Sequence, residues 1–451
     1  MKIAVVTPEV YTYGAMLVAG SLEEAGHEVK LIKVADLRSP PVDELRNYPM
    51  VCLGLYSTLH IAKLAPLIRQ LAKAGCYTVV GGPAAFEPRV VFYHIPEVDA
   101  VVVGEAEDSI AALANLFSKA SPKPPPKDLE GIPGVFFVEG DEVAGTPPKP
   151  VDLDKRPPPK IPPDIYRENI RGANVYMEIL RGCHGNCTFC QVHCMFGRVI
   201  RCRALEDVVA EAREFSRMGA SRIAISGGTV TYYRCSGYSF TDLLHSLSSL
   251  VGPDNLSTPD VRVDAVDDEV LEAIKRYTIG WIFYGIESGS QRMLNKMRKG
   301  ITLQQIKNAV EMARELGVKV AGSFIVGYLG ESDEDYEETK QLVEELSLHD
   351  CFVSIAEPLP RTPYLEEVLK SPLSENPVFV KDQGLYGRKY GLTVAEARAF
   401  DLMITGFISK PRLELLSRDV ELSFLQEAKR QGEDIRKATL MLRQALTQLS
   451  L

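Results

Sequence analysis

Three cysteines recur at a spacing typical of iron–sulfur proteins. In the run from Arg181 to Cys190, the residues Cys183, Cys187 and Cys190 form a C-x3-C-x2-C pattern. Thiolates at this spacing on one loop can bind three irons of a [4Fe–4S] cluster. The fourth iron then lacks a protein ligand, so it can chelate the amine and carboxylate of a small molecule. The spacing therefore predicts a cluster with one open iron site.

The remaining cysteines leave an alternative open. The chain has nine cysteines, and five of them lie between 183 and 202. An odd number in a chain without a recognisable export signal argues against a disulfide framework, and the clustering points to metal. A zinc site, or an electron-transfer cluster with Cys194 as the fourth ligand, is the alternative. We expect Cys194, Cys202 and Cys235 to be buried, unreactive thiols.

The cysteine loop follows a predicted strand that opens a second domain, assigned to residues 165–371. Strands alternate regularly with helices over this stretch, which predicts a barrel or part of one, with its site at the carboxyl ends of the strands. The expected strands are Val175–Leu180, Arg222–Ser226, Val261–Val263, Trp281–Ile286, Val318–Val326 and Phe352–Glu357. The clearest expected helices are Leu205–Met218, Glu269–Tyr277 and Leu303–Leu316.

The first 120 residues show the same alternation. Near-continuous apolar strands between helical segments predict a parallel, doubly wound α/β sheet, whose ligands bind beyond the carboxyl ends of the strands. No G-x-G-x-x-G follows the first strand, which weakens a dinucleotide site. The expected strands are Ile3–Val6, Val29–Lys33, Met50–Leu55, Tyr77–Val80 and Ala100–Val103, and the helices are Tyr13–Ala25, His60–Ala74 and Ile110–Phe117.

Proline separates the two domains. Residues 121–164 contain Pro124-Pro125-Pro126 and Pro157-Pro158-Pro159, which cannot continue helices or central strands. Within this connector, Val135–Val138 and a short run around Val143 predict a hairpin. Residues 372–451 are expected to be mostly helical after Thr393.

Composition excludes several classes of protein. The net charge is −9 and the pI about 5.5, which gives no sign of a broad nucleic-acid-binding surface. No apolar stretch is long enough to cross a membrane, and the N-terminus lacks the layout of a signal peptide. We therefore expect a cytoplasmic protein without nucleic-acid or membrane partners.

Companion segments of the cysteine loop resemble the radical S-adenosylmethionine (SAM) superfamily. The likeness runs from about Val175 to Pro363, in the order found in that family, and implies a partial (β/α)6 TIM barrel with a [4Fe–4S] cluster and SAM. It implies that Ser226–Thr229 binds the SAM amino group, although Thr229 stands where the family often has Glu. The full set of SAM-binding residues that it implies is Phe189, Ser226, Gly227, Gly228, Thr229, Arg262, Glu287, Ser288 and Tyr328. Taken singly, each glycine pair is more typical of a tight turn, and Arg262 and Glu287 could form a structural ion pair.

The N-terminal half resembles the Rossmann-like cobalamin-binding domains that precede radical SAM barrels. The D-x-H-x-x-G motif that supplies a cobalt-ligating His is absent, so the resemblance implies a base-off cobalamin without a His ligand, and neither His27 nor His60 is assigned to cobalt. A Rossmann-like domain without a cofactor, or with a nucleotide, is the alternative. The expected cobalamin-binding residues are Tyr11, Tyr13, Gly14, Tyr56, Ser57, Thr58, Leu59, Gly81, Gly82, Pro83, Gly104 and Glu105.

Together the two halves resemble cobalamin-dependent radical SAM methyltransferases. The resemblance implies methylation of an unactivated carbon, with SAM as radical source and as methyl donor through methylcobalamin, and an external electron donor. Within that family the layout resembles the archaeal enzymes that methylate a glutamine of methyl-coenzyme M reductase. This resemblance implies a protein or peptide substrate, and a small-molecule substrate is the alternative. Another cobalamin radical SAM reaction (cyclisation, ring contraction, P-methylation) and a non-catalytic iron–sulfur/cobalamin redox sensor are the alternatives.

Overall fold

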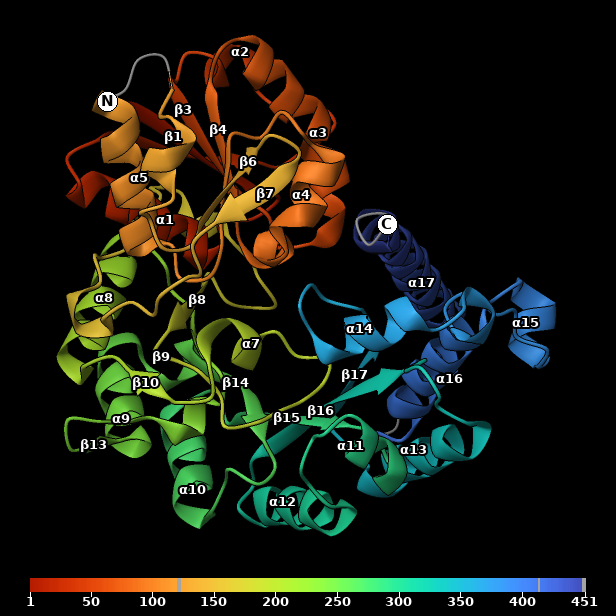
Figure 1. Cartoon of the computed structure of the whole chain (residues 1–451). Coiled ribbons are helices and arrows are strands. Elements are labelled where there is room, and N and C mark those ends of the chain that lie inside the picture. Colours follow the sequence, from red (N-terminus) through yellow and green to blue (C-terminus); the bar gives the residue numbers. More distant parts are fainter. Residues whose placement is uncertain (120–122, 413, 448–451) are drawn as a thin grey trace. The chain divides into compact units, whose positions relative to one another are not determined.

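The computed structural model describes residues 1–119, 123–412 and 414–447, and its chain forms two compact units (Figure 1). The N-terminal unit comprises Met1–Met177, Glu206–Ile223 and the chain from Met441 onward. The barrel unit comprises Glu178–Leu205 and Ala224–Leu440. The predicted boundary at residues 120 and 121 lies outside the described residues.

The N-terminal sheet has seven strands in the order β2-β1-β3-β4-β5-β6-β7. The first five pair in parallel, as predicted, because each apolar strand is followed by a helix that returns the chain to the same edge. The strands are β1 (Lys2–Pro8), β2 (Glu28–Val34), β3 (Met50–Gly54), β4 (Tyr77–Gly81), β5 (Ala100–Val102), β6 (Val135–Glu139) and β7 (Glu142–Gly145).

The predicted connector hairpin exists and has a structural role. Its strand β6 pairs antiparallel with β5, through Val101 opposite Phe136, and β7 pairs with β6. The hairpin thus extends the main sheet and covers the edge that β5 would otherwise expose.

Helices pack on both sides of this sheet. Thr12 and Ser57 cap the first two long helices by accepting a backbone N–H, which is why each helix begins directly after its strand end. The core between the strands, α1 and α5 contains Ile3, Leu22 and Leu113, all fully buried. The helices are α1 (Tyr13–Glu24), α2 (Val42–Leu45), α3 (Thr58–Lys73), α4 (Pro88–His94), α5 (Glu107–Lys119) and α6 (Pro126–Leu129).

The six strands predicted for the barrel form one open sheet, in the order β17-β16-β15-β14-β11-β8. The pairs from β14 to β17 are parallel. A partial barrel is therefore present, with β8 and β17 as its two edges. The strands are β8 (Val175–Glu178), β11 (Ile223–Ser226), β14 (Leu256–Arg262), β15 (Trp281–Glu287), β16 (Lys319–Val326) and β17 (Asp350–Ile355). Short antiparallel pairs add β9 (Leu180–Arg181) with β10 (Arg201–Cys202), and β12 (Arg234–Cys235) with β13 (Tyr238–Ser239).

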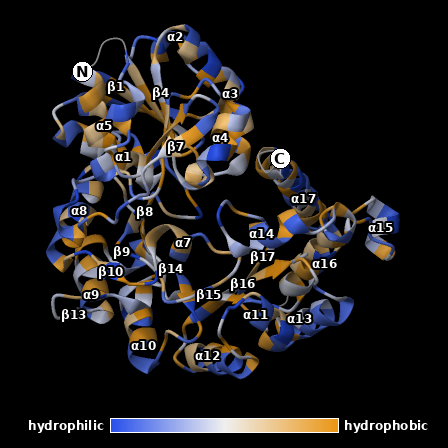
Figure 2. Cartoon of the chain, in the orientation of Figure 1, coloured by the Kyte–Doolittle hydropathy of each residue, from blue (hydrophilic) through white to orange (hydrophobic). Residues whose placement is uncertain are grey.

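Amphipathic helices cover the barrel strands, and α10 and α12 show both polar and apolar colours in Figure 2. Helix α8 belongs to the N-terminal unit by its contacts. The helices are α7 (Val192–Phe196), α8 (Leu205–Arg217), α9 (Phe240–Val251), α10 (Asp268–Tyr277), α11 (Gln291–Lys296), α12 (Leu303–Glu315), α13 (Asp333–Leu346), α14 (Pro363–Lys370), α15 (Leu385–Tyr390), α16 (Val394–Ile408) and α17 (Arg418–Thr447).

The predicted C-terminal helices close the open edge of the barrel sheet. The side-chain amide of Gln431, in α17, accepts a hydrogen bond from the Ile355 N–H at 2.9 Å and donates one to the Val353 carbonyl at 3.2 Å. The Gln431 side chain thus makes two of the hydrogen bonds that a neighbouring strand would make with β17. Without it, these backbone groups of the edge strand would lack partners on that side.

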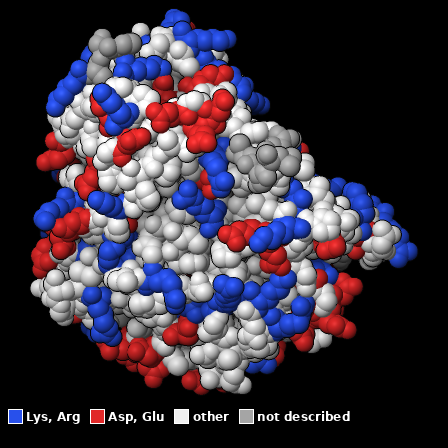
Figure 3. Space-filling view, in the orientation of Figure 1, with Lys and Arg blue, Asp and Glu red and all other residues white. Residues whose placement is uncertain are grey.

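The surface carries both signs of charge. On the face drawn in Figure 3, Lys and Arg side chains alternate with Asp and Glu, and no extended area of one sign is visible there. Among the described residues, no helix combines the length and the apolar character that a membrane span requires.

Candidate functional site

Backbone hydrogen bonds hold the cysteine loop at the end of β9. The Cys183 N–H donates to the Gly197 carbonyl at 3.2 Å, which ties the loop to the segment returning from α7. Further along, the Thr188 N–H donates to the Met297 carbonyl at 2.9 Å, and the Thr188 carbonyl accepts from the Tyr364 N–H at 2.9 Å. Segments far apart in the sequence therefore fix both ends of the loop.

Gly185 lies beside two of the three thiols. A Cβ placed on Gly185 would lie 3.4 Å from the Cys183 sulfur and 3.7 Å from the Cys187 sulfur, so a glycine leaves the space between them free. Burial raises the pKa of Cys187, against the opposing influence of the Lys299 and Arg262 cations, and burial raises the pKa of Cys190 to about 12. Metal binding would replace these protons and remove that cost.

The donor set fits a four-iron cluster. In such a cluster each thiolate binds a different iron, so the three sulfurs need not converge on one centre. Within the described ranges, no three His, Cys, Asp or Glu side chains converge on a position for one metal ion. Cys194 donates from its thiol to the Cys190 carbonyl at 3.6 Å, which places it beside the loop.

The glycine-rich end of β11 lies directly against this loop. A Cβ on Gly228 would lie 2.0 Å from the Gly182 carbonyl oxygen, and one on Gly227 would lie 2.8 Å from a Leu180 methyl carbon. The Thr229 side chain is buried, with its hydroxyl 3.9 Å from the Cys183 sulfur. The structure therefore brings Ser226–Thr229 and the cysteine loop together, and both glycines are needed for the close approach.

Arg262 ends β14 beside the cysteines. Its guanidinium makes two hydrogen bonds of 2.8 Å with the Asp264 carboxylate and donates to the Lys299 carbonyl at 2.8 Å. Its Nη1 lies 3.9 Å from the Cys187 sulfur. Asp264 thus orients Arg262 toward the cysteine loop. The alternative of a structural ion pair between Arg262 and Glu287 is wrong, because each pairs with a different residue.

The partner of Glu287 is Lys299, which the sequence did not single out. The Lys299 ammonium donates to Glu287 at 2.7 Å, and both side chains are almost fully buried. Burial disfavours the Lys299 charge, but Glu287 and Cys187 outweigh it and raise the Lys299 pKa. Glu287 has a positive φ of 72°, a strained value for a non-glycine residue. A lysine before a glycine is ordinarily exposed, so no sequence signal distinguished this one.

Three other expected SAM-binding residues are part of the packing around the loop. The Ser288 hydroxyl lies 3.1 Å from the Thr339 hydroxyl in the interior. The Tyr328 hydroxyl lies 2.7 Å from that of Thr188, and its fully buried ring stacks on Tyr364 with centroids 4.1 Å apart. Phe189 packs against the same apolar cluster. The Ser288 and Tyr328 hydroxyls therefore already have partners inside the protein.

Two expected cobalamin-binding tyrosines also hold the N-terminal unit together. The Tyr11 N–H donates to Glu168 at 3.2 Å, and Lys33 lies over the Tyr11 ring, 4.7 Å from its centroid. The Tyr13 hydroxyl donates to Glu211 of α8 and accepts from Arg156 at 2.9 Å. These side chains fix the connector and α8 to the sheet. Adjacent Gly14 has open space where a Cβ would lie.

The other expected residues share the carboxyl edge of the sheet. After β3, Tyr56 is 37% exposed, the Ser57 hydroxyl accepts from the Leu59 N–H at 3.3 Å, and Thr58 is buried.

After β4, which ends at Gly81, Gly82 has a φ of 95°, and a Cβ there would lie 2.7 Å from the Leu55 carbonyl. Pro83 follows and starts a short 3-10 turn.

The end of β5 holds the connector as well as the edge. A Cβ on Gly104 would lie 2.8 Å from Pro148, so only glycine lets the connector pass so close. The buried Glu105 carboxylate accepts from the Val151 N–H at 3.1 Å. The predicted strand ends thus lie at one edge, while the Glu105 side chain is turned to the connector.

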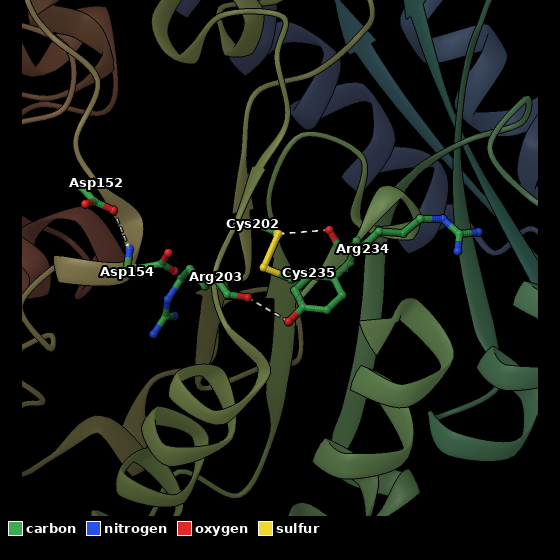
Figure 4. Close-up of a disulfide and its surroundings, with 7 residues drawn as sticks. Asp152, Asp154, Cys202, Arg203, Arg234 and Cys235 are labelled. Atoms are coloured by element: carbon green, nitrogen blue, oxygen red, sulfur yellow. Dashed lines mark hydrogen bonds between the residues drawn. A yellow bond between two sulfur atoms is a disulfide. The ribbon is translucent and has the colours of Figure 1, made fainter. Parts of the chain in front are cut away.

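The expectation that Cys202 and Cys235 are unreactive thiols is wrong. They form a disulfide between β10 and β12, with Cα atoms 5.8 Å apart (Figure 4). Beside it, the buried Tyr233 donates from its hydroxyl to the Arg203 carbonyl at 2.8 Å. Spacing could not reveal this pair, because 33 residues separate the two positions and only the fold brings them together.

The contact between the glycine-rich strand end and the loop can be tested with Gly228→Ala. The added methyl group must push the loop away from the Gly182 carbonyl, so we expect the iron content after anaerobic reconstitution to fall at least severalfold. Gly131→Ala is the control, since it has no heavy atom within 4 Å of its Cβ position and no positive φ. Equal iron content in both variants would contradict the contact.

The buried ion pair predicts an asymmetric response to substitution. Lys299→Met leaves Glu287 charged and unpaired in the interior, which costs about 3–5 kcal/mol. The free energy of unfolding from urea titration should fall by that order. The double variant Glu287→Gln, Lys299→Met should recover much of the loss, because no buried charge remains. A double variant no more stable than Lys299→Met would contradict the conclusion that the loss comes from an unpaired buried charge on Glu287.

The disulfide should be recoverable from protein purified without reductant. Alkylation, digestion and mass spectrometry should give a linked peptide pair containing Cys202 and Cys235. Replacing both residues with Ser should lower the free energy of unfolding by up to about 4 kcal/mol, because the bridge closes a loop in the unfolded chain. Free, fully alkylated thiols at both positions in unreduced protein would refute the pairing.

Comparisons with known proteins agree with this arrangement. The profile of the radical SAM superfamily matches residues 177–343, and that of the B12 binding domain matches residues 2–114. A Methanocaldococcus jannaschii protein named "Putative methylthiotransferase" is 43% identical over 452 residues, covering 98% of this chain and 96% of the relative. A Pyrococcus horikoshii protein named "Uncharacterized methyltransferase" is 30% identical over 316 residues, covering 68% and 66%.

Solved structures show the same fold. The radical SAM methyltransferase TsrM from Kitasatospora setae, with cobalamin and a [4Fe–4S] cluster bound, superposes with a TM-score of 0.68 at 15% identity, covering 97% of this chain and 98% of TsrM. The cobalamin-dependent SAM radical enzyme OxsB, with aqua-cobalamin bound, gives 0.66 at 18% identity, covering 81% and 60%. With one relative 43% identical along nearly the whole chain and both profiles matched in order, this protein belongs to the radical SAM superfamily, as a cobalamin-dependent member with an N-terminal B12-binding domain.

Proposed function

We propose that this protein is a cobalamin-dependent radical SAM C-methyltransferase that methylates an unactivated carbon. The contact of the cysteine loop with the Gly227–Gly228 strand end supports the proposal most directly, since it puts the strand end that we expect to bind SAM directly beside the three thiols. The B12-binding domain ahead of the barrel supports the use of cobalamin as methyl carrier.

The residues around the loop divide the work of binding. Cys183, Cys187 and Cys190 would hold the [4Fe–4S] cluster. Arg262, oriented by Asp264, and Lys299, held by Glu287, supply positive charge suited to the SAM carboxylate. The buried Thr229 backbone and the adjacent glycines offer polar groups to the SAM amine. When bound, the cluster and SAM supply a 5′-deoxyadenosyl radical and cobalamin supplies a methyl group, while the protein positions the reactants and excludes water.

A base-off cobalamin without a His ligand agrees with the positions of the histidines. His60 is 1% exposed, and its ring meets the Tyr56 ring edge-to-face at 4.3 Å, so the histidine lies beneath the surface. His27 precedes β2 and therefore lies at the amino edge, opposite the expected site. The expected strand-end residues after β3, β4 and β5 would bound the cofactor.

The substrate assignment rests on the family layout. We infer a protein or peptide side chain as substrate, namely a glutamine of methyl-coenzyme M reductase, with an external electron donor to reduce the cluster. A second candidate is transfer of a methylthio group, which the name of the Methanocaldococcus jannaschii relative favours. Cyclisation, ring contraction, P-methylation and non-catalytic redox sensing are the further alternatives to be separated by product analysis.

The products of an anaerobic reaction test the function. With SAM, a reductant and a peptide containing the glutamine, we expect both S-adenosylhomocysteine and 5′-deoxyadenosine, and a peptide heavier by one methylene group. A gain of a methylthio group would support the second candidate. 5′-Deoxyadenosine without S-adenosylhomocysteine would indicate another radical reaction, and the absence of both products would favour the sensor.

A variant with Cys183, Cys187 and Cys190 all replaced by Ala is the control for that assay. It should hold no [4Fe–4S] cluster after reconstitution and form no 5′-deoxyadenosine, because the three thiolates are its ligands. If it retains four irons per chain, the ligand assignment is wrong.

A further inference from the structure

A second cluster of polar side chains lies at the edge of the N-terminal sheet. It consists of Glu9, Tyr56, His60 and Lys63, which we call the switch-point cluster. Glu9 follows β1, and Tyr56 follows β3. In the strand order β2-β1-β3-β4-β5, the chain reverses its direction of winding between β1 and β3. Open α/β sheets bind their ligands at this point, outside the carboxyl ends of the strands.

Glu9 is held in a strained conformation at this point. Its φ is 65°, in the left-handed region, where a non-glycine residue is uncommon. The Glu9 N–H donates to the Val34 carbonyl at 2.9 Å, so the edge of β2 fixes this conformation. Strain of this kind persists where the surrounding structure enforces it, and it concentrates at ligand sites.

The carboxylate of Glu9 holds the Tyr56 hydroxyl. The Tyr56 hydroxyl donates to Glu9 at 2.7 Å, and the Lys63 ammonium lies 3.5 Å from the same carboxylate. Burial and the adjacent Glu9 raise the pKa of Tyr56, so the phenol keeps its proton. Although these contacts hold it, Tyr56 is 37% exposed. So many specific contacts are unusual for an aromatic residue at the surface.

The buried His60 packs against the Tyr56 ring. Its imidazole meets Tyr56 edge-to-face with centroids 4.3 Å apart, and its Nε2 lies 3.7 Å from Glu9. Burial lowers the His60 pKa to about 4, so the ring is neutral. Its Nδ1 is buried and has no hydrogen-bond partner among the described residues. A polar ring kept at this cost has a role beyond filling space.

The chemistry of cobalamin decides which face the cluster would meet. The nucleotide tail leaves the corrin ring on its lower face. If the tail is displaced from cobalt and enters the crevice of the domain, that lower face must turn toward the carboxyl edge of the sheet. A flat macrocycle there calls for an apolar, rigid and uncharged contact, which an aromatic ring supplies.

We propose that Tyr56, held by Glu9 and His60, is the side chain that contacts the lower face of the corrin ring. This inference rests on the proposed function. Glu9 and His60 are then positioning residues, which fix the direction of the Tyr56 ring and hydroxyl.

The test measures cobalamin binding by the full-length protein, independently of turnover. Hydroxocobalamin is titrated anaerobically into wild type, Tyr56→Ala and Glu9→Gln, followed by the absorption spectrum of the bound form and by its electron paramagnetic resonance in the Co(II) state. We expect Tyr56→Ala to weaken binding at least about tenfold and to change both spectra. Glu9→Gln should change the spectra in the same direction with a smaller loss of affinity.

Tyr93→Ala is the matched control. Tyr93 ends α4 in the same unit, is 40% exposed and meets His94 edge-to-face at 5.0 Å, as Tyr56 meets His60. It should bind cobalamin like wild type. Where Tyr56→Ala does not fold, Tyr56→Leu removes the aromatic ring but keeps an apolar side chain, and it should also weaken binding and change the Co(II) spectrum.

The outcomes separate this inference from the function on which it rests. Wild-type affinity and spectra in Tyr56→Ala, or in a folded Tyr56→Leu, overturn the inference and leave cobalamin dependence intact. Loss of binding in Tyr93→Ala equal to that in Tyr56→Ala overturns it as well. A wild-type protein that binds no cobalamin overturns both the inference and the proposed function.

Discussion

The close approach of two backbone segments controls the arrangement of the barrel site. The carbonyl of Gly182, just before the cysteine loop, occupies the place where any side chain at position 228 would begin. Because neither segment can withdraw without breaking the bonds that tie the loop to Gly197 and Met297, the glycine at 228 is a steric requirement. The same approach brings Thr229 to Cys183.

Charge is distributed around the thiols so that each buried cation has a carboxylate of its own. Asp264 neutralises Arg262, and Glu287 neutralises Lys299. Both cations lie close enough to Cys187 to oppose the effect of burial on its pKa. Since isolated buried charges are costly, this pairing allows two positive groups to stay beside the loop without destabilising the fold. An anionic cluster or a carboxylate is the chemistry that such a surface suits.

The two units use their strand ends differently. In the barrel unit, the strand ends after β11, β14 and β15 carry residues that face the cysteine loop. In the N-terminal unit, the side chains of Tyr13 and Glu105 hold α8 and the connector. At this edge Gly82 and Gly104 allow close contacts with Leu55 and Pro148, and Tyr56 is 37% exposed.

The sequence by itself determined the order of elements and the spacing of the three cysteines. Apolar strands followed by amphipathic helices are local patterns, so both parallel sheets, their strand ends and the connector hairpin were predictable, and Cys183, Cys187 and Cys190 are near neighbours on one loop. Tertiary structure alone decided the pairings between distant residues. The Lys299–Glu287 pair, the Cys202–Cys235 bridge, the Gln431 cover on β17 and the Glu9–Tyr56 contact join positions from 12 to 78 residues apart. Nothing in the local pattern marks those partners, because their proximity follows from how strands and helices pack.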